Sequence, residues 1–328
     1  MGIYVKRRNL KGIDRQNSVV KFDENARHGK ITGSRFLSVL GKDEYTTEFK
    51  AACMLARVCF DDTKTKYTMA GDTIEPFMRS YVRDKKDTML RNILGTDGQI
   101  AVEEPISKEV CFYDHFPGDK LFGGMVDGYI DVNGDRYAIL EIKTCSDRSM
   151  WFEEDGSTKI PEGYYLQASL YAVLSNLEKV VFAVAFLEDK DYDEPEKFVP
   201  DDGNTLVFMV DKKDMTREMA DAREWYSKYI DAGMTPPWTE KDAELVEIIA
   251  TSDTIDDMPN DARRLFKKYV RMVDSDEDAS DLEYNLKEIM SERVTEGVRT
   301  LVYKVDGATF SYSAENDRLT FTPDSIRN

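Results

Sequence analysis

The hydrophobic pattern changes from helical to strand-like along the first half of the chain. From Ile31, apolar residues recur at helical spacing, and Thr32-Gly33-Ser34 offers an N-cap for a helix containing Phe36 and Leu40. Further helices are predicted over Glu48–Val58 and Ile74–Arg83. A strand-rich part starts near Val110, so the chain combines helices and strands.

The strongest local prediction is a β-hairpin. Apolar and polar residues alternate over Met125–Val132 and again over Arg136–Lys143, and Asn133-Gly134-Asp135 lies between them as a turn. The remaining pattern completes a mixed α/β protein. It predicts helices over Tyr164–Leu174, Met215–Ala232, Ala262–Val273 and Leu282–Arg293, strands over Val180–Leu187 and Thr205–Val210, and a second hairpin from Val302–Val305 and Thr309–Tyr312.

These elements divide the chain of 328 residues into three parts. Residues 1–21 are polar and basic and are expected to form an arm. Residues 22–237 form the main α/β domain, which ends near the Pro236-Pro237 break. Residues 238–328 form an extension of helices and a hairpin.

Composition favours a folded cytoplasmic protein. The apolar fraction of 41% is enough for a core. The longest apolar run, Val180–Leu187, is far too short to cross a bilayer, and Met1–Lys6 runs into charge without a leader segment. We therefore expect no membrane contact.

Cysteine and histidine are too scarce for several kinds of active site. No two cysteines form a CxxC pair, so a structural zinc site is disfavoured and reduced thiols are expected. Two histidines leave little material for a Ser-His-Asp triad or a His-rich metal site. Carboxylates, lysines and tyrosines must carry most of the chemistry. The residues concerned are Cys53, Cys59, Cys111, Cys145, His28 and His115.

The net charge of −18 is unevenly distributed. Residues 1–60 hold 12 Lys/Arg and 6 Asp/Glu, or +6, whereas residues 236–328 hold 12 and 21, or −9. The middle of the chain therefore carries −18 − 6 + 9 = −15. A basic N-terminal segment suits phosphate contacts and an acidic middle suits metal ions, although both are also compatible with ordinary solvated faces.

Strand parity gathers two carboxylates and an ammonium on one face of the first hairpin. Asp127, Glu141 and Lys143 occupy odd positions, and the even positions are apolar. Asp127 lies opposite Glu141 only if paired residue numbers sum to 268, whereas a two-residue turn at Asn133-Gly134 gives 267. We therefore predict a loop of odd length, or a bulge with the same effect.

Two carboxylates that face each other favour a divalent cation between them. Burying both without one is costly, and oxygen ligands suit Mg²⁺ or Mn²⁺. Lys143 follows on the same face, where it can orient or polarise a water, as a phosphodiester-hydrolysis site requires. A surface salt bridge is the alternative interpretation of these three residues alone.

Two further segments join the hairpin in a recognisable order. A glutamate, Glu75, follows Gly71 early on a predicted helix, and the hairpin itself contains a GxxD element at Gly124–Asp127 and an ExK element at Glu141–Lys143. A YxxQxxxY element then places Tyr164, Gln167 and Tyr171 on one helix face.

In this order and spacing, the elements resemble the PD-(D/E)XK nuclease superfamily. More narrowly, from about Arg27 to about Pro237 the chain looks like the lambda-type phage exonucleases and the YqaJ-like viral recombinase family. The resemblance implies a restriction-endonuclease-like core, a central mixed sheet flanked by helices. It makes residues 22–237 the nuclease domain of a Mg²⁺-dependent deoxyribonuclease, with one or two ions.

The resemblance also implies a role for each motif residue. Asp127 and Glu141 would bind the metal together with the carbonyl of Ile142, and Glu75 would bind it directly or through water. Lys143 would position or activate the attacking water. Gln167 would hold that lysine or the phosphate, and Tyr171 would support its helix.

A further match lies at Arg27-His28-Gly29-Lys30-Ile31-Thr32-Gly33-Ser34, which is similar to the family's R-x-G-x-I-T-x-S stretch. There the arginine and serine contact a terminal 5′-phosphate, and an arginine with a helix N-terminus does suit an anion. The alternative interpretation of this stretch is an ordinary capped helix preceded by a surface arginine. Trp151, in the loop after the second hairpin strand, is either a stacking platform at the DNA end or a core aromatic.

The family setting implies a 5′-to-3′ exonuclease acting on linear double-stranded DNA ends in phage-type recombination. Its partner would be a single-strand annealing recombinase, and the chain would form a homo-oligomeric ring, commonly a trimer in that family, in the host cytoplasm. The acidity of residues 238–328 argues against DNA binding there. The alternatives are an endonuclease of restriction or repair type and a non-catalytic DNA-end binding module.

Overall fold

The computed structural model describes residues 3–6, 9–61, 63–105, 114–251, 254–255, 260–274, 278–291, 300–305, 308–314 and 316–323. The expected start of the strand-rich part near Val110, and Cys111, lie outside these ranges. The chain divides into two compact units. Unit 1 comprises residues 1–28, 52–62 and 232–328, and unit 2 comprises residues 29–51 and 63–231.

Unit 2 contains a five-stranded mixed sheet with the order β11-β10-β9-β8-β6. Only the β9–β10 pair is parallel, and the other neighbours are antiparallel. The fold class is therefore mixed α/β, as predicted. Its strands are β6 (Ile100–Glu103), β8 (Gly128–Val132), β9 (Asp135–Cys145), β10 (Lys179–Phe186) and β11 (Thr205–Asp211), with the short pair β4 (Ile31–Thr32) and β7 (Phe122–Gly123) outside it.

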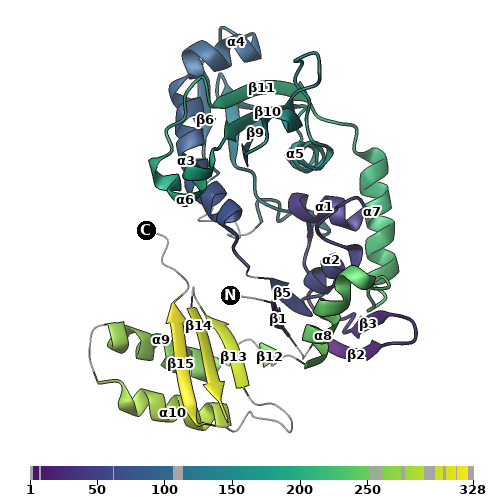
Figure 1. Ribbon diagram of the computed structural model, residues 1–328, viewed down its shortest axis with the longest axis vertical. Helices are drawn as coiled ribbons and strands as arrows, with labels where there is room; N and C mark the ends of the chain where they lie inside the picture. The colour runs from purple at the N-terminus through teal and green to yellow at the C-terminus, as the bar shows by residue number, and fades with distance from the viewer. Residues whose placement is uncertain are drawn as a thin grey trace. The chain divides into compact units, whose positions relative to one another are not determined.

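Helices cover both faces of this sheet, and Figure 1 shows α3 (Lys66–Asp84) and α5 (Glu162–Leu174) on opposite sides of it. Ile74 and Met78 of α3 pack on even-numbered β9 residues such as Leu140. Ala168 and Tyr171 of α5 pack on the other face. The other helices of unit 2 are α1 (Gly33–Val39), the first half of α2 (Glu48–Leu55), α4 (Arg91–Leu94), α6 (Asp189–Asp193) and α7 (Thr216–Tyr229), with short turns over Lys86–Leu90, Arg148–Trp151 and Pro195–Lys197.

The β8–β9 hairpin contains the bulge that strand parity required. Its turn is the two-residue Asn133-Gly134, both with positive φ, and next to the turn Val132 pairs with Asp135. The register then shifts, so that Ile130 pairs with Ala138 and Tyr137 becomes the extra residue. From there the paired numbers sum to 268, which brings Asp127 and Glu141 onto one face.

Helix α3 begins earlier than the predicted Ile74. Thr65 caps it in a capping box with Thr68. Glu75 therefore lies in the middle of α3, followed by Pro76 inside the helix. Because proline lacks an N–H, it cannot donate to the carbonyl of Asp72, and the helix continues because Ile74 and Met78 are fully buried.

Unit 1 joins segments from both ends of the chain. Its six-stranded sheet has the order β15-β14-β13-β12-β1-β5. Helices α9 (Asn260–Asp274) and α10 (Ser280–Ser291) pack with β13 and β14 through a separate core around Phe266 and Phe310. The strands are β1 (Ile3–Val5), β5 (Cys59–Asp61), β12 (Thr254–Ile255), β13 (Thr300–Val305), β14 (Ala308–Ser313) and β15 (Arg318–Pro323), and the unit also contains the short turn Glu240–Asp242 and α8 (Ala243–Thr251).

The N-terminal residues form strands where an arm was expected. Strands β2 (Leu10–Asp14) and β3 (Val19–Phe22) pair, and Val20 and Phe22 are fully buried. The amide of Phe22 donates to the carbonyl of Gly233, so the segment is held by residues near the end of the predicted main domain.

No described helix is long and apolar enough to cross a bilayer.

Candidate active site

Three polar side chains of the hairpin meet at the α5 face of the unit 2 sheet. Asp127 directly precedes β8, and Glu141 and Lys143 lie on β9. The Glu141 side chain is fully buried, and its Oε1 accepts a hydrogen bond from Lys143 Nζ at 2.5 Å. Asp127 Oδ2 accepts from the Ile142 amide at 2.7 Å. The structure thus brings together the trio that the sequence placed on one face.

Helix α5 supplies the next layer through Gln167 and Tyr171. Gln167 Nε2 donates to Glu141 Oε1 at 2.7 Å, so this oxygen is shared by an amide and an ammonium. The Tyr171 ring lies against two glycines. A Cβ at Gly33 would stand 2.8 Å from the Tyr171 hydroxyl, and one at Gly124 would stand 2.5 Å from it. The glycines of the two sequence motifs therefore allow the backbone to approach this tyrosine.

Helix α3 contributes a third carboxylate, Glu75, and also Arg79, which is not part of the sequence motifs. Arg79 pairs with Glu75 one turn earlier and also with Glu104 at 3.2 Å. Its Nε donates to the backbone carbonyl of Asp127 at 2.8 Å. Arg79 is nearly buried and holds the Asp127 backbone in place. Its spacing of four residues from Glu75 was the available signal, but that spacing is common on helices.

His115 is a second residue that the motifs did not include. Its Nδ1 accepts a hydrogen bond from the Val126 amide at 3.2 Å, and its own amide donates to the Gly124 carbonyl. Burial lowers the pKa of His115, against the opposing effect of the Asp114 and Asp127 carboxylates. A neutral imidazole therefore braces the segment that leads into Asp127.

The carboxyl groups of the site resist ionisation because they are buried together. Burial raises the pKa of Glu141 to about 8, although the Lys143 ammonium opposes the shift. Burial also raises the pKa values of Asp127 and Glu75. For Lys143, burial favours the neutral amine, but Glu141 and Asp127 outweigh it and hold its pKa above the usual value. Lys143 is therefore a fixed cation among carboxyl groups that resist ionisation.

The oxygen atoms of the site suit a divalent cation. Among the described residues no group of three or more His, Cys, Asp or Glu side chains converges on one point. However, Glu141 Oε2 is buried without a hydrogen-bond partner, beside the raised-pKa carboxyl of Asp127. Mg²⁺ commonly uses one or two carboxylates and keeps several waters. Two carboxylates, one with an unused buried oxygen, meet that requirement.

The sequence is similar to a known protein family and to two bacterial relatives. The family model of the YqaJ-like viral recombinase domain matches residues 24–178. The chain is 32% identical to the "Uncharacterized protein MG373" of Mycoplasma genitalium over 253 residues, which cover 66% of the chain and 85% of that relative. This chain belongs to the YqaJ-like viral recombinase family. The homologue of that relative in Mycoplasma pneumoniae matches with the same identity and coverage.

Solved structures with some likeness to the chain are exonucleases by description. An alkaline exonuclease from Laribacter hongkongensis gives a TM-score of 0.41 at 17% identity, over 63% of this chain and 90% of that one. A phage-related exonuclease from Haemophilus somnus gives 0.39 at 15% identity, over 63% and 96%.

The expected phosphate-binding residues of the YqaJ-like domain fall in different units. Arg27 is exposed in unit 1, in a segment without regular structure. Ser34 is exposed on the first turn of α1 in unit 2, and its hydroxyl lies 3.1 Å from that of Thr32, the N-cap residue. Each residue is accessible to a ligand, and their joint action stays a prediction.

The structure corrects the expectation that Trp151 contacts a DNA end. Its side chain is fully buried. The indole stacks on Tyr164 at 5.7 Å between ring centroids and meets the edges of Phe182 and Phe208. An aromatic ring with no exposed surface cannot stack on a base. Trp151 therefore belongs to the core beneath α5, the alternative that the sequence had left open.

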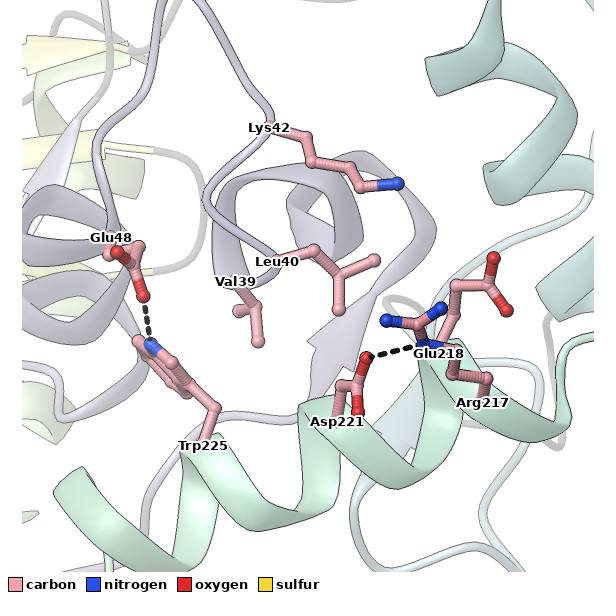
Figure 2. A pocket seen from close by; sticks show the side chains of 8 residues that line it. All are labelled: Val39, Leu40, Lys42, Glu48, Arg217, Glu218, Asp221 and Trp225. Carbon is pink, nitrogen blue, oxygen red and sulfur yellow. Dashed lines mark hydrogen bonds and ion pairs between the residues drawn. The ribbon is translucent and has the colours of Figure 1, made fainter.

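A pocket of about 350 Å³ lies at the opposite end of α1 from Ser34 (Figure 2). Val39 and Leu40 form its apolar part, and Trp225 of α7 closes one side by donating from Nε1 to Glu48 at 2.8 Å. The charged residues around it are Lys42, Glu48, Arg217, Glu218 and Asp221. Acidic residues outnumber basic ones, so the pocket is a poor site for phosphate and is better explained as packing of α7 on α1.

Arg79 yields a prediction that separates positioning from catalysis. We expect Arg79→Met to lower the free energy of unfolding by about 2–3 kcal/mol, because it leaves charged partners and the Asp127 carbonyl without their donor. Nuclease activity should fall by roughly 10–100-fold, as for residues that orient metal ligands. Urea denaturation and an initial-rate assay would measure both quantities.

Arg217→Met is the matched control, because Arg217 is an exposed arginine on α7 that lies 3.8 Å from its partner Asp221. It should leave both quantities within error of the original protein. Equal losses in the two variants would contradict the role of Arg79.

Proposed function

We propose that the chain is a divalent-metal-dependent deoxyribonuclease that hydrolyses phosphodiester bonds at the site around Glu141. The observation that carries the proposal is the fully buried Glu141 carboxylate, bound through one oxygen by Lys143 and Gln167 and with its other oxygen unpaired. Membership of a viral recombinase family supports DNA as the substrate. A purely structural salt bridge between Lys143 and Glu141 would not explain why Glu141 Oε2 is buried without a hydrogen-bond partner.

In this proposal Asp127, Glu141 and the carbonyl of Ile142 hold Mg²⁺ or Mn²⁺, with Glu75 binding directly or through water. Glu75 is drawn toward Arg79 in the structure, which suits a water-mediated contact. A bound ion would lower the pKa of a water and neutralise charge on the phosphate, and a second ion would share these tasks.

Lys143 provides the fixed positive charge of the reaction. Since its pKa is raised, it cannot act as a general base at neutral pH. It donates hydrogen bonds, and can thereby orient the attacking water or stabilise the negative charge that develops on the phosphate. Gln167 limits the movement of Glu141 and so keeps Lys143 in place. The water oxygen forms the new bond to phosphorus as the bond to the leaving oxygen breaks.

The proposal extends to an exonuclease that acts 5′-to-3′ on linear double-stranded DNA. Its support is the exposed Ser34 at the start of α1 and the exposed Arg27, in a stretch similar to a 5′-phosphate site. An endonuclease has no terminal phosphate to bind, so these two residues favour the exonuclease. An annealing recombinase partner and a ring-shaped oligomer belong to the same proposal and can be examined by co-purification and by light scattering.

Linear duplexes with and without a 5′-phosphate, and covalently closed circular DNA, would test this function. We expect cleavage of the linear substrates only, with a preference for the phosphorylated end that Ser34→Ala and Arg27→Gln reduce by about tenfold each, the value of a lost hydrogen bond to a charged group. Initial rates of nucleotide release measure the effect.

Ser149→Ala and Arg217→Gln are matched controls on exposed residues and should change nothing. Cleavage of the closed circle would favour the endonuclease instead. Absence of metal-dependent cleavage of every substrate would favour the binding module.

A further inference from the structure

Helix α9 presents a uniformly basic face in a chain whose net charge is −18. Residues 262–273 contain five Lys or Arg and no Asp or Glu. Arg264, Lys267, Lys268 and Arg271 are all exposed. Their spacing of three, four and seven residues from Arg264 places them on one side of the helix. We call these four residues the α9 basic face.

The opposite side of α9 is packed in a hydrophobic core, which keeps the α9 basic face exposed to solvent. Ala262 and Phe266 are buried in the core of the C-terminal strands, where the rings of Phe266 and Phe310 lie 4.8 Å apart. Leu286 and Met290 of α10 complete that core. Because the apolar side is fully used by packing, the helix cannot rotate to bury its cations.

A groove of about 600 Å³ runs along the basic face. The four residues of the face and Arg263 line it, and Leu265 and Leu282 provide its apolar part. No described carboxylate forms an ion pair with Arg264, Lys268 or Arg271. The groove is therefore concave and cationic, and Arg264, Lys268 and Arg271 provide donors that no described carboxylate occupies.

The arrangement is unfavourable for the helix itself. Like charges three and four residues apart destabilise an isolated helix, and exposed helices usually alternate the sign of charge at these positions. Four such pairs occur within the basic face. A polyanion that binds there would relieve the repulsion between these cations. A surface needed only for solubility would not require so many like charges on one side of a helix.

We propose that the α9 basic face binds the phosphate backbone of DNA, independently of sequence and of DNA ends. The face extends over seven residues, or about 10 Å along the helix, which matches about three successive phosphates of one strand. Two of its residues are arginines, whose planar donors suit phosphate oxygens. The choice of DNA among polyanions rests on the proposed function, but the face lies outside the residues that carry that function.

This inference changes the interpretation of the C-terminal part. Its net charge of −9 argued against contact with DNA, but five of its 12 cations are concentrated in one helix. Local charge at the groove, rather than the sum over the region, determines which ligand approaches. A second DNA contact of this kind would keep a long substrate bound between cleavage events.

The test compares the full chain with a variant in which the four residues of the basic face are replaced by glutamine. Binding to a closed dumbbell duplex and to a single-stranded circle would be measured by fluorescence anisotropy in EDTA, where neither ends nor cleavage contribute. Loss of about three phosphate contacts should weaken binding at least tenfold and reduce the slope of log K against log salt by about 2–3. Between 50 and 200 mM salt the original protein should therefore lose roughly 20–40-fold more affinity than the variant.

The control variant replaces four lysines that each pair with a carboxylate, and it should bind like the original protein. Those lysines are Lys11, Lys179, Lys190 and Lys197. Circular dichroism should show both variants folded. Preference for the duplex or for the single strand identifies which form the groove accepts, and either result supports the proposal.

Two outcomes would overturn it. One is equal affinity and equal salt dependence in the original protein and the basic-face variant. The other is tighter binding of a poly-glutamate peptide than of either DNA at the same salt concentration, which would assign the groove to an acidic protein. If cleavage of linear DNA is never observed but dumbbell binding is lost in the variant, the proposed nuclease function fails while this inference stands.

Discussion

Replacing Lys143 by alanine should reduce DNA cleavage by roughly 10³-fold, the range expected when a positioned proton donor or charge-stabilising group is removed. The reason lies in its surroundings. Lys143 is the cation that hydrogen-bonds Glu141, whose side chain is fully buried. Without it, the site loses both its fixed positive charge and the partner of a buried carboxylate. Single-turnover rates at saturating Mg²⁺ would measure the chemical step directly.

Two variants make the Lys143 result specific. Lys159→Ala removes a more exposed lysine, paired weakly with Glu153 at 4.0 Å, and should cleave at the original rate. Lys143→Arg keeps the charge but not the geometry of the ammonium, so it should recover only part of the lost activity. A Lys143→Ala protein that is folded and fully active would contradict our assignment of the site.

Removal of divalent metal should abolish cleavage entirely, and addition of Mg²⁺ should stabilise the folded protein. Metal that binds only the folded state at 100 times its Kd contributes about 2.7 kcal/mol. For a protein of this size that corresponds to a rise of roughly 5 °C in Tm. Because the carboxyl groups must lose their protons to bind metal, and the pKa of Glu141 is raised to about 8, the apparent affinity should increase as the pH rises toward that value.

Differential scanning fluorimetry with a Mg²⁺ titration would check this prediction. Asp127→Asn and Glu141→Gln should each lose the Mg²⁺-dependent shift as well as the activity. Glu188→Gln, on an exposed carboxylate, should keep both. If Mg²⁺ shifted all of these proteins equally, the metal would be binding somewhere other than the proposed site.

The hairpin shows what sequence alone could predict about the site. Alternation placed Asp127, Glu141 and Lys143 on one face, and arithmetic on the register required a bulge or an odd-length loop. The structure contains the bulge, at Tyr137. Its exact position could not be predicted, because Tyr137 fits the alternating pattern as well as its neighbours do. Parity is a property of local sequence, but the choice between compensating irregularities depends on packing.

Features that depend on contacts between distant segments were not predictable in the same way. Arg79 looks like any helix arginine until the fold brings the Asp127 carbonyl to it. From the sequence, Trp151 could equally contact DNA or lie in the core. Its contacts with Tyr164 and Phe182 in the folded protein distinguish the two alternatives. Strand β6 was missed because it has only four residues, and β15 because no glycine marks a turn before it. The α9 basic face was missed for a related reason. The net charge of residues 236–328 carries no information about which side of a helix is charged.

The pairing of the two chain ends has a consequence for synthesis on the ribosome. Val5 lies beside Thr254 in the sheet of unit 1, and the amide of Trp238 donates to the carbonyl of Ser18. More than 200 residues must therefore be synthesised after Val5 and Ser18 before these partners exist. Contacts of such long range slow folding, and unpaired strands exposed in the interval favour aggregation. The nascent chain should consequently depend on chaperones, and a ribosome stalled soon after residue 231 would carry unit 2 in full while β1 still lacked its partner β12.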